Sequence, residues 1–219
     1  MKKILSGLVL LTGLNIIVSA QPPKGMGQSD PAAKKILDGV SAKFKTFKSV
    51  QAKFTLKIEN TAGKSLGSKS GSVYMKSTKY RISVTGQEVF CDGSNVWTYT
   101  KADNEVVITK LDASNNSSIT PQKLFTNFYD KDFLYKLNGE AKGLQEIELT
   151  PIDKTKPFFK VIVNVSKKAQ TISSTKVFEK AGNRYTYGVS SMITTAVVAD
   201  TQFVFDAKKY PGVEVVDNR

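Results

Sequence analysis

Histidine is absent from the 219-residue sequence, and its absence excludes several kinds of site. Ser-His-Asp and Cys-His nucleophilic sites need an imidazole base, and histidine-ligated zinc needs imidazole ligands. The phosphate-binding patterns G-x-x-x-x-G-K-[ST] and G-x-G-x-x-G at a strand-to-helix turn are missing as well. We therefore expect no catalytic residue, no metal site and no cofactor.

Cysteine is almost absent too, since Cys91 is the only one in the chain. A single cysteine cannot form an internal disulfide. In a strand-like setting it is more often a small buried hydrophobic residue than a reactive thiol, and we predict that role for Cys91.

Carboxylates are the one catalytic resource that remains. Asp103 lies close to Glu105 in the sequence, and Asp130 lies close to Asp132. A glycan or lipid hydrolase needs two such groups at a suitable separation, so a carboxylate-dependent hydrolase stays open as an alternative. Turn formation and helix capping are the interpretation we favour, because near pairs arise easily among 19 acidic residues.

Long apolar runs are confined to the start of the chain. Lys2 and Lys3 precede an apolar stretch over 4–18, and small residues up to Ala20 form a cleavage site. This pattern predicts a signal peptide over 1–20, cleaved after Ala20, and an exported protein. Gln21 stands where a lipid-anchored protein would carry a cysteine, so we expect a soluble mature chain.

Arginine is scarce, with three residues, although the formal net charge is +13. The excess comes from lysines scattered along the chain, which is not typical of nucleic-acid recognition. Anionic lipid surfaces or acidic partner proteins fit an exported protein better, and a merely solvated basic surface is equally open. We expect no nucleic-acid partner.

The remaining sequence predicts one domain over 29–219, after a flexible lead at 21–28 that contains two prolines and two glycines. Apolar residues at helical spacing predict a helix from Pro31 to Phe47, capped by Ser29 or Asp30. A second helical segment, which could act as a lid, is predicted over 121–128.

Alternating apolar and polar residues predict roughly eleven strands, separated by turn pairs such as Asp92-Gly93 and Asn138-Gly139. They lie at 50–58, 73–75, 80–84, 89–91, 96–98, 106–108, 144–149, 158–165, 171–178, 184–197 and 203–205. So many short antiparallel strands must curl, which predicts a mainly β fold: an incomplete antiparallel barrel with helices over its concave face. Alternation alone leaves open whether that face holds a packed core or a cavity.

Three stretches of the chain resemble the LolA-type family of periplasmic outer-membrane lipoprotein carriers. The first is the stretch Phe47–Phe54, through which the predicted helix leads into the first strand. The second is the strand 71–76 with the hairpin 91–99, which contains Asp92-Gly93 and Trp97. The third is the end of the chain, 203–205 with 211–217.

This resemblance implies a monomeric periplasmic carrier with a helical lid over an apolar cavity. Its partners would be acylated lipoproteins, an inner-membrane lipoprotein exporter and an outer-membrane acceptor. Aromatic and flexible apolar side chains suit acyl cargo. The residues that we expect to bind lipid are Phe54, Val73, Met75, Tyr80, Ile82, Trp97, Tyr99, Leu124, Phe125 and Phe128.

The lid contact is where the sequence departs from the family. Well-known members follow the strand lysine with Arg-Pro, and this arginine is tied to lid opening and closing. Ser77-Thr78 stands at those two places here. Lys76, Lys79 or Arg81 could take over the polar lid contact, and Lys76 and Arg81 are our first candidates. A periplasmic lipid or lipoprotein sensor on the same fold remains an alternative, although a second domain would be expected of it.

Overall fold

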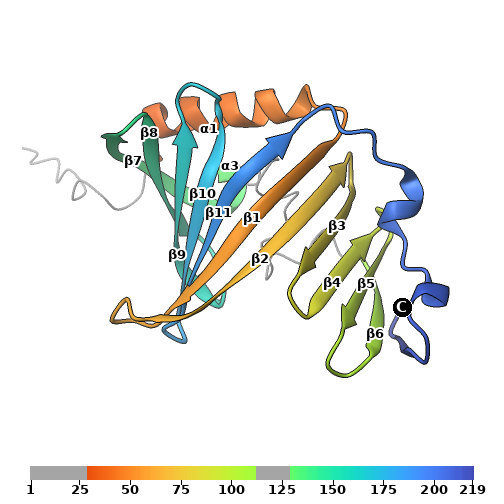
Figure 1. Ribbon diagram of the computed structural model, residues 1–219. Coiled ribbons are helices and arrows are strands. Elements are labelled where there is room, and N and C mark those ends of the chain that lie inside the picture. The colour runs from red at the N-terminus through yellow and green to blue at the C-terminus, as the bar shows by residue number, and fades with distance from the viewer. Residues whose placement is uncertain (1–28, 112–128) are drawn as a thin grey trace, which may run out of the picture.

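The computed structural model describes residues 29–111 and 129–219, and most of these residues lie in one large β-sheet (Figure 1). The sheet has twelve strands, in the order β12-β6-β5-β4-β3-β2-β1-β11-β10-β9-β8-β7. The strands are β1 (Val50–Glu59), β2 (Ser65–Lys76), β3 (Lys79–Val84), β4 (Gln87–Cys91), β5 (Asn95–Thr100), β6 (Glu105–Lys110), β7 (Phe133–Ala141), β8 (Leu144–Pro151), β9 (Phe158–Ser166), β10 (Thr171–Glu179), β11 (Arg184–Ile193) and β12 (Glu214–Asp217).

Neighbouring strands run antiparallel from β6 to β7, and the sheet stays open because β12 and β7 form its two edges. The prediction of a mainly β, incomplete antiparallel barrel is confirmed. One pairing differs, since β12 runs parallel to β6. The chain reaches β12 through a long return along the sheet rather than through a hairpin, and such a return permits a parallel strand.

Helical structure among the described residues is limited to four short elements. They are α1 (Pro31–Lys45), α3 (Tyr129–Asp132) and the 3₁₀ turns η1 (Asp200–Phe203) and η2 (Ala207–Lys209). Helix α1 crosses one end of the sheet, while η1 and η2 lie beside the β3–β6 half (Figure 1).

The predicted start of α1 is confirmed, with Asp30 as the capping residue. One carboxylate oxygen of Asp30 accepts the Ala32 N–H at 2.8 Å, and the other accepts the Leu137 N–H at 3.1 Å. Both bonds lower the pKa of Asp30, the bond from Leu137 having the larger effect. The cap therefore also ties the start of α1 to strand β7.

The two faces of the sheet carry separate apolar clusters. The inner face is the one that α1 covers, and Leu37, Val40 and Phe44 of the helix pack there with buried side chains of β1–β4 and β7–β10. The outer face has a smaller cluster on β4–β6, which packs with apolar residues of the C-terminal segment 200–213. Alternation along a strand sends successive side chains to opposite faces, so both clusters come from the same period-two pattern.

Several strand predictions were wrong, and β12 was not predicted. Residues 203–205 end the 3₁₀ turn η1 and continue as irregular chain, although Phe203 is fully buried. Strand β11 ends at Ile193 rather than at 197. Strand β7 was missed, and its Asn138-Gly139, predicted to form a turn, lies within the strand at a β-bulge opposite β8. A bulge accommodates one extra residue without ending the strand.

Within residues 29–111 and 129–219, no helix has the length and apolar character needed to cross a bilayer. The predicted signal peptide, the flexible lead and the helical segment at 121–128 all lie outside the described residues, and the assignment of one domain to 29–219 stays a prediction.

Candidate functional site

Five of the predicted lipid-binding residues share the inner face. Strand pairing places Met75 beside Tyr80 and Val73 beside Ile82, while Phe54 lies beside Gly71 on the neighbouring strand. Val73, Met75 and Tyr80 are buried, whereas Phe54 and Ile82 are half-buried and pack at the margin of the same cluster.

The apolar surface around these residues is wider than the sequence analysis indicated. Half-buried side chains extend it in both directions along the sheet, to Val89 and Val96 on β4 and β5 and to Val189 and Met192 on β11. The alternation in these strands was visible in the sequence. What was missing was the pairing of β1 with β11, which joins segments far apart in the chain.

Tyr80 and Cys91 form the deepest part of this region. They are cross-strand partners on β3 and β4, and Cys91 has no exposed surface. Burial is the main cause that raises the pKa of both side chains, so both stay neutral at physiological pH. The prediction that Cys91 is a small buried residue is confirmed.

Trp97 and Tyr99 lie on the other face of the sheet, which corrects the predicted cavity lining. Trp97 pairs with Phe90, while the inward-facing Cys91 pairs with Val96. Both aromatic residues belong to the outer cluster with Phe205 and Tyr210. The ring of Tyr99 lies 4.5 Å from that of Tyr210 and 5.9 Å from that of Phe205, centroid to centroid. They pack the C-terminal segment onto the sheet and cannot share a cavity with Met75 and Tyr80.

Leu124, Phe125 and Phe128, predicted to supply the lid, lie outside the described residues.

Lys76 and Lys79, two candidates for the lid contact, form ion pairs with the C-terminal segment. The Lys76 ammonium is 2.8 Å from one carboxylate oxygen of Asp200, and that of Lys79 is 2.8 Å from the other. These two lysines hold the pKa of Asp200 down, to about 2. Lys76 therefore helps to fasten η1 to the β2–β3 hairpin.

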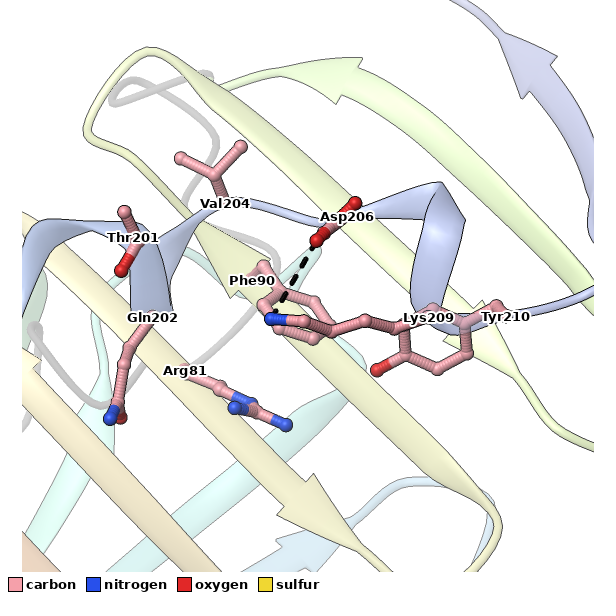
Figure 2. A pocket seen from close by; sticks show the side chains of 8 residues that line it. All are labelled: Arg81, Phe90, Thr201, Gln202, Val204, Asp206, Lys209 and Tyr210. Carbon is pink, nitrogen blue, oxygen red and sulfur yellow. Dashed lines mark ion pairs between the residues drawn. The ribbon is translucent and has the colours of Figure 1, made fainter.

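Arg81 lies on the outer face beneath the same segment (Figure 2). Its guanidinium donates to Glu88 at 2.7 Å and lies 4.8 Å from the centre of the Phe90 ring. The Tyr210 hydroxyl donates to the same Glu88 carboxylate at 3.2 Å. A cavity of about 260 Å³ lies here, between Arg81 and Phe90 of the sheet and residues 201–210 of the C-terminal segment. Within the described residues Lys76 thus pairs with Asp200 and Arg81 with Glu88, and their role as lid contacts stays a prediction.

Two of the carboxylates considered for the hydrolase alternative lie in different surroundings. Asp130 accepts hydrogen bonds from the Lys34 ammonium at 3.1 Å and from the Tyr135 hydroxyl at 3.2 Å, which fastens α3 to α1 and β7. Asp103 is exposed in the β5–β6 turn. Across residues 29–111 and 129–219, no group of three or more acidic or cysteine side chains could hold a metal ion.

Comparisons with known proteins agree with this architecture. A family model described as outer membrane lipoprotein carrier protein LolA matches residues 45–206. An outer-membrane lipoprotein carrier protein from Cupriavidus necator is 27% identical over 209 residues, which cover 92% of this chain and 97% of that protein.

Among solved structures, one shares the fold at lower identity. An uncharacterized conserved protein from Thermus thermophilus is 14% identical, with a TM-score of 0.56, and the match covers 85% of this chain and 99% of the other. A LolA superfamily protein from Nitrosomonas europaea is also 14% identical, with a TM-score of 0.44 over 80% and 98% of the two chains.

The matched region runs from the end of α1 to the C-terminal segment, and so contains β1–β11 and the apolar inner face that they build. A match over this much of the chain shows that the chain belongs to the LolA family.

Proposed function

We propose that this protein is a soluble periplasmic carrier that shields the acyl chains of lipoproteins between the inner and the outer membrane. The observation that carries the proposal is the continuous apolar inner face of an open sheet in a member of the LolA family. Support also comes from the Cupriavidus necator relative, which is named as an outer-membrane lipoprotein carrier protein.

The physical need for a carrier is large. Each methylene group withdrawn from water is worth about 0.8 kcal/mol, so a triacylated protein will not cross an aqueous compartment unshielded. We assign acyl binding to Phe54, Val73, Met75, Tyr80 and Ile82, together with their half-buried neighbours Val89 and Val96. These side chains offer apolar area without requiring one exact ligand shape.

Release of the cargo must be as easy as its uptake. The apolar side of α1, with Leu37, Val40 and Phe44, packs on the inner face. We propose that this helix and the segment after β6 take up apolar area that the cargo leaves, which offsets the loss of acyl burial. An inner-membrane exporter and an outer-membrane acceptor would be the partners at the two ends of the route.

The direct experiment has two arms. The mature protein is purified from periplasm and its intact mass is measured under native conditions; bound triacylated polypeptides are the expected finding. The protein is then depleted from cells, and lipoproteins are expected to accumulate at the inner membrane. Ligand-free protein together with normal lipoprotein sorting after depletion would contradict the proposal.

A further inference from the structure

Three large apolar side chains are exposed at the end of the sheet farthest from α1. Leu66 is 57% exposed, Ile152 is 50% exposed and Phe159 is 49% exposed. Leu66 belongs to the β1–β2 hairpin, and Ile152 and Phe159 flank the β8–β9 turn. The β10–β11 turn lies between these two hairpins, because β10 and β11 separate β1 from β9 in the sheet (Figure 1).

Backbone irregularities place two of these side chains. The register of β2 against β1 skips Leu66, since Ile58 pairs with Gly67 and Glu59 with Ser65. The register of β9 against β10 likewise skips Phe159, since Phe178 pairs with Lys160 and Glu179 with Phe158. Each is therefore the extra residue of a β-bulge, a device that redirects a side chain out of the regular alternation.

The same end of the sheet is strongly cationic. We name it the tip, and define it as residues 57–67, 152–160 and 176–184. These ranges contain eight lysine and arginine residues and three acidic residues, a net charge of +5. Lys57, Lys64, Lys154 and Lys180 are exposed.

An aromatic ring lies among the cations of the tip. Lys160, Lys176 and Arg184 place their charged groups 4.6, 5.7 and 5.5 Å from the centre of the Phe178 ring. The exposed Phe159 ring lies 6.1 Å from Phe178, centroid to centroid. Of the three acidic residues, Glu59 is already paired with Lys176 at 2.6 Å. The tip thus presents apolar side chains framed by positive charge.

We infer that the tip docks the protein on the surface of an anionic phospholipid bilayer. Apolar side chains on separate hairpins enter the headgroup region, while the surrounding lysines bind lipid phosphates. Apolar side chains that stand among cations on separate turns suit a fluid anionic surface, which requires no single complementary shape. This inference goes beyond acyl carriage and does not depend on it, because none of the residues assigned to acyl binding lies in the tip.

The test is flotation of the mature protein with vesicles of phosphatidylglycerol and phosphatidylethanolamine, against vesicles of phosphatidylcholine. The protein is expected to float with the anionic vesicles only, and high salt should release it. The double variant Lys154→Glu/Lys180→Glu should lower the affinity roughly 30-fold or more, since two favourable charges are lost. The control Lys101→Glu/Lys168→Glu makes the same charge change in exposed turns outside the tip and should bind as the parent does.

Insertion is tested separately from charge. Leu66→Cys is labelled with an environment-sensitive dye, which reacts there because Cys91 is buried. Anionic vesicles should shift the dye emission to the blue, whereas the same dye on Lys101→Cys should show no shift. The variant Leu66→Ser/Phe159→Ser should lose flotation while keeping acyl binding.

Three results would overturn the inference. They are equal binding to neutral vesicles, equal losses in the tip and control charge variants, and unchanged flotation of Leu66→Ser/Phe159→Ser without a dye shift. The last would show a purely electrostatic attachment, without entry of apolar side chains into the headgroup region.

Discussion

The ring of Phe54 lies over the α-carbon of Gly71, its partner on the neighbouring strand. A methyl group at position 71 would overlap that ring and come within 2.7 Å of the Ser83 carbonyl oxygen. Gly71 is therefore needed for a close approach between side chain and backbone on the inner face, a recognised role of glycine within strands.

This relationship predicts the outcome of Gly71→Ala. The substitution should lower the free energy of unfolding by about 1–3 kcal/mol, because Phe54 and the Ser83 backbone must move. Gly188→Ala is the matched control, since Gly188 also lies within a strand and a methyl group there would have no other atom within 4 Å. Urea unfolding of both variants measures the difference, and equal stabilities would contradict the packing described for Phe54.

Trp97 offers a built-in reporter because it is the only tryptophan in the chain. Since it lies on the outer face, an acyl ligand carrying bromine atoms should leave its fluorescence unquenched. Phe205→Ala should instead make Trp97 more accessible to a soluble quencher, because Phe205 packs against the outer cluster. Strong quenching by the brominated ligand would place the cargo on the outer face and contradict binding at the inner one.

The ion pairs at Asp200 predict a pH effect at the C-terminal segment. Because Lys76 and Lys79 depress the pKa of Asp200 from 3.8 to about 2, the contact is fully present above about pH 4 and is lost as the pH falls toward 2. The protection of residues 200–217 against hydrogen exchange, expressed relative to the intrinsic exchange rate at each pH, should therefore fall over that range. In Asp200→Asn this protection should already be low at neutral pH and should change less on acidification; a variant with the parent's profile would contradict this role.

Substitutions at Asp130 and Asp103 distinguish a structural role of these carboxylates from a catalytic one. Asp130→Asn should weaken the junction of α1, α3 and β7, because the amide replaces an acceptor of the Lys34 and Tyr135 hydrogen bonds. Loss of a charge-assisted hydrogen bond typically costs about 1.5–3 kcal/mol, and solvent exposure of this one should reduce the loss below that range. Asp103→Asn should change neither stability nor acyl binding, as thermal unfolding and a binding titration will show. Loss of function with intact folding in either variant would favour the hydrolase alternative.

The sequence was sufficient to predict the architecture but not the assignment of every face. Alternation predicted most of the strands between 50 and 193, β7 excepted, because one side of most of them is dry and the other wet. It failed for Trp97 and Tyr99 because β5 is covered on both faces, so the large side chains did not mark the inner one. The face on which each residue of β5 lies could be assigned only from the strand register, which pairs Trp97 with Phe90 and Val96 with Cys91.

Other features had no local signal at all. Leu66 and Phe159 are redirected by bulges that depend on the partner strand, and the pairing of β1 with β11 depends on the whole chain. The stretch 203–205 alternates like a strand, yet Phe203 is buried from a 3₁₀ turn. Such placements come from tertiary packing, which overrides local preference.

The central claim is that acyl chains bind the inner face, and two adjacent residues of β3 test it most directly. Ile82 belongs to the inner cluster, while its neighbour Ser83 lies on the opposite face. A titration with a fluorescent acyl probe, on variants whose folding is checked by circular dichroism, should show binding weakened at least about tenfold by Ile82→Glu, because a carboxylate then enters apolar surroundings. Ser83→Glu should bind as the parent does. Equal binding by both folded variants, or a loss confined to Ser83→Glu, would contradict acyl binding at the inner face.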